Sequence, residues 1–292
     1  MPRDVALLDT EALPEFRNGV PTLAELDALK ASDFYGELKS YNDAFLQQHD
    51  AALRGYGRHW GDDPMRLWSR RFEYPFAAAA VMAQADRVGR TDLVCCDAGS
   101  GVTFLPYLLA ERLDGATFAC CDPNTTYAKM FAAVNEQHDG RVSYDASPIQ
   151  KLPFDDGGLD VLMCVSVLEH TGDYAAVVDE MARVVKPGGR LVLTFDLGLD
   201  GKFELLPASS KLVLDRLGEH FVLDLEDLKR QADEAYHDAT GLLSTPEVKA
   251  REPEHLPWKY PRLQAMYDLV RGYGWTGGFR SVAPMCLDLQ RQ

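Results

Sequence analysis

The sequence lacks the cysteine patterns of a metal site and has no long apolar run. Its six cysteines include no Cys-x-x-Cys motif and no cluster with histidine, which argues against both a zinc site and a disulfide framework. Apolar stretches such as residues 76–83 fall far short of the roughly 18 residues that a membrane span needs. The first residues are acidic and contain no apolar segment, so no signal peptide is expected. These absences predict a soluble cytoplasmic protein with buried free thiols.

Positive charge is also scarce. The chain has 30 lysines and arginines against 45 aspartates and glutamates, for a net charge of −15 in 292 residues and a pI near 4.9. Nucleic acids and anionic membranes are bound mainly by basic side chains, so this balance argues against both as partners. A hydrophobic content of 46% fits a globular chain of one large domain, or one domain with a sizeable cap.

The sequence lacks the phosphate-binding motifs Gly-Lys-Ser/Thr and Gly-x-Gly-x-x-Gly. Residues 94–103 instead predict a buried strand that ends in Asp97, a turn that contains Gly99 and Gly101, and a helix from about Val102. Glycine lets a ligand approach the backbone closely, because it has no Cβ and adopts positive φ easily. An acid at this point suits a cationic ligand rich in hydroxyls or amines better than a phosphate.

Strands and helices alternate through residues 92–197 with short connections. Near-continuous apolar strands separated by helices predict an α/β fold with a mostly parallel sheet that helices cover on both faces. Ligands bind such sheets at the carboxyl ends of the strands. The expected strands are 93–97, 117–122, 141–145, 159–165 and 190–197, and the expected helices are 102–113, a segment after Asn124 to about 137, and 174–185.

The two flanks differ from this core. We expect a helical N-terminal cap at 1–75, a core at 76–202, a helical cap or insertion at 203–275 and a final core strand at 276–292. Helices are expected near 210–218, 225–237 and 262–273, and the last strand at 282–289. The sixth strand is either Phe221 to Leu225 or Trp275 to Arg280. The flanks are rich in aromatic residues, about half of which are expected to pack against the sheet.

Further signals follow the glycine turn, each at the end of a predicted strand. They are, in order, Asp122 after the second strand, Asp145-Ala146-Ser147 after the third, Leu168-Glu169-His170 after the fourth, and Lys186-Pro187-Gly188-Gly189 before the fifth. Over residues 70–200 this ordered set resembles the class I S-adenosylmethionine (SAM)-dependent methyltransferases, of the subgroup with a Leu-Glu-His motif. The resemblance implies a Rossmann-like, seven-stranded sheet. Thr103 departs from the pattern, since the family commonly has a third glycine there.

The resemblance implies SAM as the cofactor and assigns residues to it. Asp97 would accept from the ammonium group, Asp122 from both ribose hydroxyls and Asp145 from the adenine amine; Asp122 as a helix cap and Asp145 as a solvated turn acid remain the alternatives. Arg70, Arg71 or Tyr74 is expected either to meet the methionine carboxylate or to cap a helix at the surface. The expected cofactor-binding residues are Tyr74, Asp97, Ala98, Gly99, Ser100, Gly101, Asp122, Pro123, Asp145, Ala146, Ser147, Cys164 and Val165.

Methyl transfer from SAM needs a positioned acceptor and, where the acceptor carries a proton, a base. His170 is the candidate base, and packing is its alternative role. The residues expected near the acceptor are Tyr35, Tyr41, His170, Tyr236, Trp258 and Tyr260. One branch of the family binds metal through Glu-x-x-Glu-His, but Ser166 stands at the first of these positions, which leaves too few ligands, so no metal is expected.

The acidic charge and the absence of an Asn-Pro-Pro-Tyr-like motif after the fourth strand predict a small-molecule acceptor, methylated at oxygen, nitrogen or carbon. The aromatic flanks fit a largely apolar acceptor pocket, such as that of a biosynthetic enzyme. Three other readings stay open: a SAM enzyme that catalyses cyclisation, elimination or a pericyclic reaction, a non-catalytic interaction module, and a nicotinamide oxidoreductase, which the missing glycine motif disfavours. A homodimer is compatible with the sequence.

Overall fold

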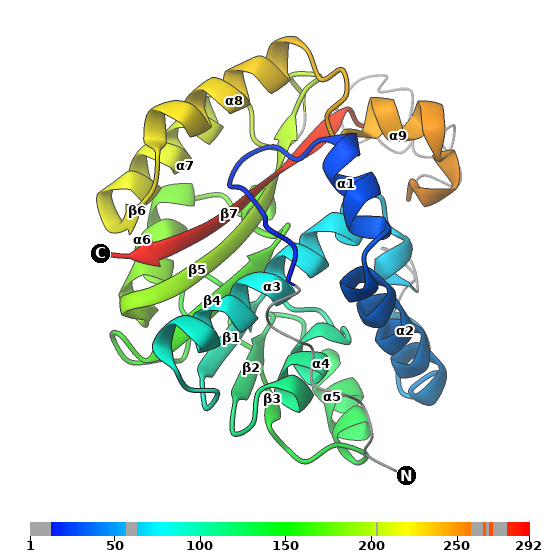
Figure 1. The fold of residues 1–292 in the computed structure, drawn as a ribbon, viewed down its shortest axis with the longest axis vertical. Helices are drawn as coiled ribbons and strands as arrows, with labels where there is room; N and C mark the ends of the chain where they lie inside the picture. Colours follow the sequence, from blue (N-terminus) through cyan, green and yellow to red (C-terminus); the bar gives the residue numbers. More distant parts are fainter. Residues whose placement is uncertain (1–12, 57–62, 203, 258–264, 267–268, 271–278) are drawn as a thin grey trace.

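The computed structural model describes residues 13–56, 63–202, 204–257, 265–266, 269–270 and 279–292. Its centre is a seven-stranded sheet of order β3-β2-β1-β4-β5-β7-β6 (Figure 1). Five neighbouring strands run parallel, and β7 runs antiparallel to both β5 and β6. The predicted α/β fold class is confirmed. The strands are β1 Val94–Ala98, β2 Thr117–Cys121, β3 Val142–Asp145, β4 Leu159–Val165, β5 Val185–Gly198, β6 Phe221–Val222 and β7 Val282–Arg291.

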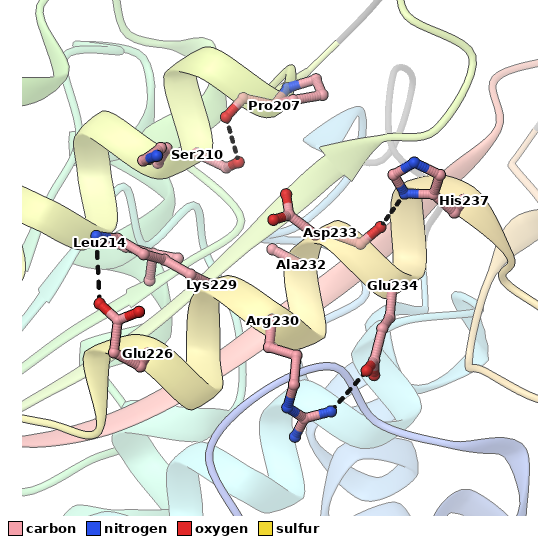
Figure 2. A pocket seen from close by; sticks show the side chains of 11 residues that line it. Pro207, Ser210, Leu214, Glu226, Lys229, Arg230, Ala232, Asp233, Glu234 and His237 are labelled. Carbon is pink, nitrogen blue, oxygen red and sulfur yellow. Dashed lines mark hydrogen bonds and ion pairs between the residues drawn. The ribbon is translucent and has the colours of Figure 1, made fainter.

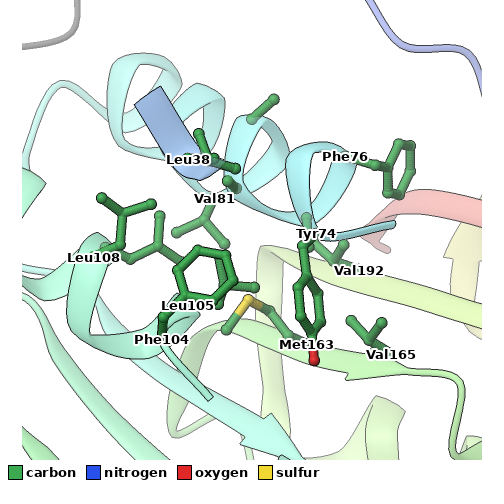
Figure 3. Packing of buried hydrophobic residues seen from close by; sticks show 14 of the residues in the cluster. Leu38, Tyr74, Phe76, Val81, Phe104, Leu105, Leu108, Met163, Val165 and Val192 are labelled. Atoms are coloured by element: carbon green, nitrogen blue, oxygen red, sulfur yellow. The ribbon is translucent and has the colours of Figure 1, made fainter. Parts of the chain in front are cut away.

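Apolar side chains fill both faces of the sheet because successive strand residues point to opposite sides. On β1, Cys95 packs in one buried cluster and Cys96 in the other, and on β4 Met163 and Leu162 divide in the same way. The first cluster lies under α3 Arg70–Val88, α4 Leu105–Arg112 and α5 Tyr127–Asn135, and the second under α6 Tyr174–Val184, α7 Pro207–His220 and α8 Leu225–His237. Figure 3 shows the first cluster around Tyr74 and Phe104. All six cysteines are buried and free, as predicted.

The N-terminal helices α1 Leu23–Lys30 and α2 Asp33–Gln48 pack on α3 and α4, on the first face. Short helices complete the described chain: η3 Pro64–Arg66, η4 Leu168–His170, α9 Thr245–Arg251 and η5 Pro253–His255. A capping box starts α1, because Thr22 accepts from the Glu25 amide while the Glu25 carboxylate accepts from the Thr22 amide. No helix in these ranges has the length and apolar composition needed to cross a membrane.

The segment before α1 covers an edge that the two-residue strand β6 leaves open. Gly19 exchanges two backbone hydrogen bonds with Cys286 of β7, each 2.9 Å long. The Asn18 side chain bonds both the amide and the carbonyl of Asp288. An uncovered strand edge offers unpaired amides to other chains, so this segment protects β7.

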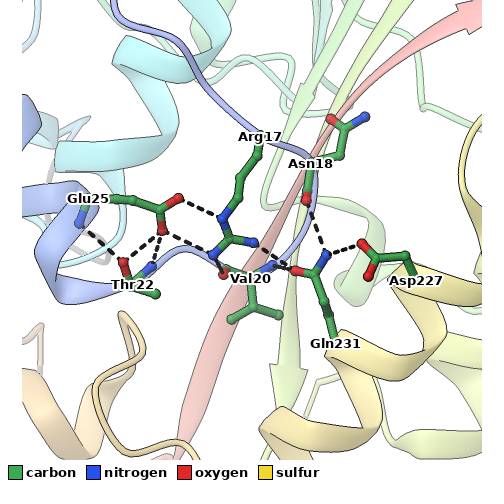
Figure 4. Close-up of polar contacts among 7 residues, drawn as sticks. All are labelled: Arg17, Asn18, Val20, Thr22, Glu25, Asp227 and Gln231. Atoms are coloured by element: carbon green, nitrogen blue, oxygen red, sulfur yellow. Dashed lines mark hydrogen bonds and ion pairs between the residues drawn. The ribbon is translucent and has the colours of Figure 1, made fainter.

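Arg17 and Gln231 bind the same segment to α8 on the second face (Figure 4). The Arg17 guanidinium contacts Glu25 of α1, the Val20 carbonyl and Gln231 Oε1. Gln231 Oε1 also accepts from the Val20 amide, and its Nε2 donates to Asp227. The first turn of α1 is thereby tied to the helical layer on the other side of the sheet.

Several element boundaries differ from the sequence prediction. The sixth strand lies at Phe221–Val222, the first of the two alternatives. Helix α4 begins at Leu105 rather than Val102, with Pro106 in its first turn, so Thr103 lies in the preceding loop. Strand β5 begins at Val185 rather than 190, because the Pro-Gly-Gly run lies within a register irregularity of the ladder and does not end it.

Residues 207–237 lie inside the segment predicted as a cap, but they form α7, β6 and α8. These elements add a strand to the sheet and cover its second face, so the structure places them with the core and not over the strand ends. The amphipathic helices bury Leu214, Leu217 and Leu228 against the sheet, which is the reason for this placement. The other predicted domain boundaries stay predictions.

Candidate functional site

The glycine turn follows β1 at the carboxyl end of the sheet. Gly99 and Gly101 have φ of +75° and +54°, and the Gly99 amide donates to the Cys121 carbonyl at 2.6 Å. An added Cβ on Gly99 would overlap the side chain of Val167, and one on Gly101 would overlap the hydroxyl of Tyr56. Both the backbone conformation and the close neighbours therefore require glycine here.

Tyr56 is a residue of this site that the sequence analysis did not select. Its ring lies edge-on to Tyr127, with centroids 5.5 Å apart, and burial raises the pKa of its hydroxyl. The sequence shows only an aromatic residue within the predicted helical cap, some 45 positions before Gly101. That separation leaves no local signal of the contact.

Asp97 is the next-to-last residue of β1, beside this turn, and is buried. Burial raises the pKa of its carboxyl to about 7, the neighbouring Asp122 adds to the rise, and Arg70 opposes it. Tyr74 of α3 lies in the same region, where burial raises the pKa of its hydroxyl to about 12. A cation that binds beside such a buried carboxyl stabilises its ionised form strongly.

Asp122 follows β2, the neighbour of β1, and Asp145 is the last residue of β3, which lies on the far side of β2. Asp122 is half-buried, and its two carboxylate oxygens accept from the Asn124 amide at 2.9 Å and the Gly101 amide at 3.4 Å. These local bonds fit the turn-capping alternative as well as a ribose contact. Asp145 is exposed and its side chain contacts the Ser147 hydroxyl. Its backbone carbonyl accepts a hydrogen bond from the Asp122 amide at 3.2 Å.

The remaining predicted cofactor residues surround the same strand ends. Ala98 and Ser100 are buried, whereas Pro123 and Ala146 are exposed. At the end of β4, Val165 packs in the cluster under α3 and Cys164 in the cluster under α6. The structure thus brings the predicted set to one edge of the sheet; contact with a cofactor stays a prediction for each residue.

The two arginines that begin α3 point to different places. Arg71 is buried and donates to Glu252, just after α9, at 2.6 Å, whereas Arg70 reaches Ser166 Oγ at 2.6 Å and pairs with Glu73. Of the two, Arg70 therefore lies at the strand ends. Arg71 serves to hold the segment after α9 against α3.

Glu73 is fully buried, and its carboxylate binds side chains from three parts of the fold. Ser166 Oγ, after β4, donates to Glu73 Oε1 at 2.7 Å, Thr194 Oγ1 of β5 donates to the same oxygen at 2.6 Å, and Arg70 pairs with the other oxygen. Burial alone would raise the pKa of Glu73, but the Arg70 charge and the hydroxyl donors lower it. Ser166 adopts φ of +49°, a costly conformation that the surrounding bonds maintain.

Two further carboxyls lie near this network without such partners. Glu169 of η4 is 7% exposed, and neither its Oε2 nor the buried Oδ1 of Asp196 on β5 has a hydrogen-bond partner. Burial raises the pKa of each well above its usual range. Asp196 and Glu204 add to the rise for Glu169, Glu73 and Glu204 add to it for Asp196, and Arg70 opposes both shifts. No group of three histidine, cysteine or carboxylate side chains in the described part of the chain is arranged to hold a metal ion.

His170, the predicted base, is half-exposed at the end of η4. Its side chain is 47% accessible, and Nδ1 lies 3.7 Å from Glu204, which also pairs with Arg280 at 2.7 Å. Burial of part of the ring lowers the pKa of His170, and Glu204 opposes this shift. A neutral imidazole is the form that a general base needs.

The predicted acceptor-binding aromatics are dispersed. Tyr35 is buried on α2, Tyr41 donates its hydroxyl to Glu111 of α4 at 2.7 Å, and Tyr236 of α8 donates to the Leu205 carbonyl at 2.7 Å. These bonds give the hydroxyls of Tyr41 and Tyr236 structural roles. Trp258 and Tyr260 lie outside the described residues.

A cavity of about 450 Å³ lies between α7 and α8 (Figure 2). Its walls carry both signs of charge, and Figure 2 shows Arg230 and Glu234 paired beside it. None of its lining residues follows β1, β2, β3 or β4. It is therefore separate from the strand-end residues described above.

The part of the chain that contains the strand-end residues matches a known protein family. Residues 96–193 match the model of a methyltransferase domain. An uncharacterized methyltransferase of Mycobacterium sp. (strain JLS) is 33% identical over 141 residues, which are 47% of this chain and 52% of that protein. The methyltransferase-domain match begins within β1 and ends within β5, so it contains the predicted cofactor residues at the ends of β1, β2 and β3.

Two other relatives differ in their named acceptors. A tRNA U34 carboxymethyltransferase of Campylobacter curvus (strain 525.92) is 24% identical over 138 residues, 47% of this chain and 46% of the relative. A 27-O-demethylrifamycin SV methyltransferase of Amycolatopsis mediterranei (strain S699) is 35% identical over 77 residues, 26% of each chain. The chain spans about half the length of the curated relatives it matches first.

Proposed function

We propose that this chain, a class I SAM-dependent methyltransferase with S-adenosylmethionine as its cofactor, transfers a methyl group to a small-molecule acceptor. The methyltransferase-domain match, which contains the glycine turn, supports the family and the cofactor predicted from the sequence. The relatives' names include both a tRNA and a rifamycin acceptor, so the acceptor class rests on the residues of this chain.

The strand-end residues fit the cofactor. Gly99 and Gly101 expose the backbone of the turn, and Asp97 gains a cationic partner for its buried carboxyl when an ammonium group binds beside it. Asp122 and Asp145 take the ribose and the adenine in this proposal, and Arg70 is the candidate for the methionine carboxylate. When bound, SAM supplies a methyl group activated by the adjacent sulfonium.

The charge at the strand ends is the observation that favours a small acceptor over a nucleic acid. Five carboxyls gather there, on Glu73, Asp97, Glu169, Asp196 and Glu204, and the nearby arginines are Arg70 and Arg280. The whole chain carries −15. Phosphate backbones are attracted by lysine and arginine, and an excess of carboxylates repels them.

His170 is the candidate base in this reaction. It is accessible, its pKa is lowered and Glu204 lies 3.7 Å from its Nδ1. In this role the ring takes a proton from the acceptor while the neighbouring side chains position the acceptor for in-line attack on the methyl carbon.

The test compares acceptors under one assay. Purified protein is incubated with methyl-labelled SAM and either bulk tRNA or a panel of small amines, alcohols, phenols and carboxylic acids, and both label transfer and S-adenosylhomocysteine are measured. We expect label in a small molecule and none in tRNA, with one S-adenosylhomocysteine formed per methyl transferred. Transfer to tRNA would contradict the proposal, and consumption of an acceptor without S-adenosylhomocysteine would point to the non-methylating alternative.

A further inference from the structure

Glu169 and Asp196 are the least compensated carboxyls of the proposed site. Each has a buried oxygen with no hydrogen-bond partner. Glu169 is carried by η4 just beyond β4, and Asp196 by the adjacent strand β5, so both lie at the carboxyl end of the sheet. Burying an unpaired polar oxygen costs free energy that is recovered only when a partner arrives.

The other three carboxyls of the cluster already have partners. Glu73 is held by Arg70, Ser166 and Thr194, and Glu204 by Arg280. Asp97 adjoins the glycine turn and is assigned to the cofactor's ammonium group in the proposed function. The charged side chains that act on Glu169 and Asp196 are Glu73, Glu204, Arg70 and Arg280, so that four carboxyls in all are matched by two arginines.

From this arrangement we infer that the acceptor is an amine, and that Glu169 and Asp196 bind its nitrogen. The inference rests on the proposed methyltransferase function and names the acceptor class for it. A cationic or N–H-bearing group supplies the hydrogen bonds that both buried oxygens lack, and a charged ammonium also offsets the excess negative charge. An alcohol or phenol has a single O–H donor and no positive charge, so it satisfies one oxygen at most.

For an amine acceptor, this pair and not His170 takes the proton that must leave before methylation. An ammonium nitrogen has no lone pair, so one N–H proton moves to an ionised carboxylate of Glu169 or Asp196, which becomes neutral. The free amine then forms the N–C bond with the methyl carbon while the C–S bond breaks and its electrons stay on sulfur. The product is a methylated ammonium ion beside a neutral thioether, so charge and atoms balance. Burial, which favours the neutral carboxyl, assists the proton transfer.

The test uses amines and alcohols of identical skeleton, such as benzylamine with benzyl alcohol and piperidine with cyclohexanol. Wild type, Glu169→Gln, Asp196→Asn and the control Glu234→Gln are assayed with labelled SAM. We expect transfer to amines in preference to their matched alcohols. Each of the first two variants should lower kcat/KM for the amine about tenfold to a hundredfold, as loss of a charged hydrogen bond implies. Glu234→Gln changes an exposed ion pair on α8 and should behave as wild type.

Calorimetric titration with SAM separates failure of this inference from failure of the proposed function. All four proteins should bind SAM with Kd values within about a factor of three. Preferred transfer to alcohols, phenols or tRNA, or wild-type kcat/KM in both the Glu169→Gln and the Asp196→Asn variants, would overturn the amine assignment alone. SAM binding with no transfer to any amine would also overturn it. If wild type bound no SAM, the proposed function would fail, and the inference with it.

Discussion

At the scale of single residues, the contact between Tyr56 and Gly101 gives the sharpest prediction. Gly101→Ala places a methyl group against the Tyr56 hydroxyl in a backbone with φ of +54°. We expect SAM affinity to fall by about tenfold or more, since overlap adds at least about 1 kcal/mol to the backbone strain. Isothermal calorimetry measures the change.

Two further variants isolate the cause. Gly140→Ala has a similar positive φ, +80°, but open space around the added carbon, so it should cost stability through strain alone and leave SAM affinity unchanged. Tyr56→Phe in the Gly101→Ala background removes the overlapping oxygen and should recover part of the affinity. Equal affinity losses in the alanine variants at 101 and 140 would show that the contact with Tyr56 is irrelevant.

The residues of the site also differ in how far sequence predicts them. The turn at Gly99 and Gly101 is a local pattern and is found where it was expected. Ser166 was read as the loss of a metal ligand, but the structure shows its hydroxyl linking Arg70 and Glu73 across 93 residues of chain. No pattern within one segment reveals a bond between two segments so far apart.

At the scale of elements, the bond between the N-terminal segment and α8 predicts a mutational effect. Gln231→Ala removes the acceptor of Arg17 and of the Val20 amide as well as the donor to Asp227. We expect the free energy of unfolding to fall by about 1 to 2 kcal/mol, the usual value for a few partly buried hydrogen bonds. Hydrogen exchange should accelerate at residues 18–20 and at 286–288 of β7, whose edge this segment covers.

Arg230→Ala is the matched control for that experiment. Arg230 lies one position away on α8, and its ion pairs with Asp227 and Glu234 stay within the helix. Exposed pairs of this kind contribute less than about 1 kcal/mol, and exchange at the β7 edge should not change. Equal exchange in both variants would mean that Gln231 does not hold the segment.

Element boundaries show where sequence patterns stop being informative. Helix α8 begins and ends where periodicity predicts, because its apolar stripe and its cap Asp224 are local. Strand β5 extends through Pro187-Gly188-Gly189 because pairing with β4, which shifts register there, holds the backbone extended. Strand β6 has two residues, too few for a periodic signal, and exists through pairing with β7.

At the scale of the whole molecule, stability should depend on pH through the buried carboxyls. The pKa of Asp97 rises from 3.8 to about 7 on folding, so the folded state binds its proton more tightly than the unfolded state does. Its contribution is therefore complete below about pH 4 and is lost as the pH rises to about 7. Glu169 and Asp196, whose pKa values are also raised, act in the same direction.

Asp97→Asn measures this effect against wild type, because groups common to both proteins cancel in the difference. The stability of the asparagine variant relative to wild type should increase by up to about 1.4 kcal/mol per pH unit between about pH 5 and 7, then level off. Urea unfolding at a series of pH values gives the slope. Saturating SAM should reduce the slope, because the ammonium group stabilises ionised Asp97. A pH-independent difference would show that Asp97 is ionised throughout.

By itself, the sequence determined the succession of strands and helices along the chain, the glycine turn and the resemblance to a methyltransferase domain, because each depends on residues close together in the chain. Only the tertiary structure decided which side chains meet at the strand ends. Tyr56 against Gly101, Ser166 between Arg70 and Glu73, and the unpartnered oxygens of Glu169 and Asp196 arise from packing between distant segments. The burial of a side chain and its hydrogen-bond partners are properties of the folded core. They identify Glu169 and Asp196 as the side chains proposed to bind the acceptor.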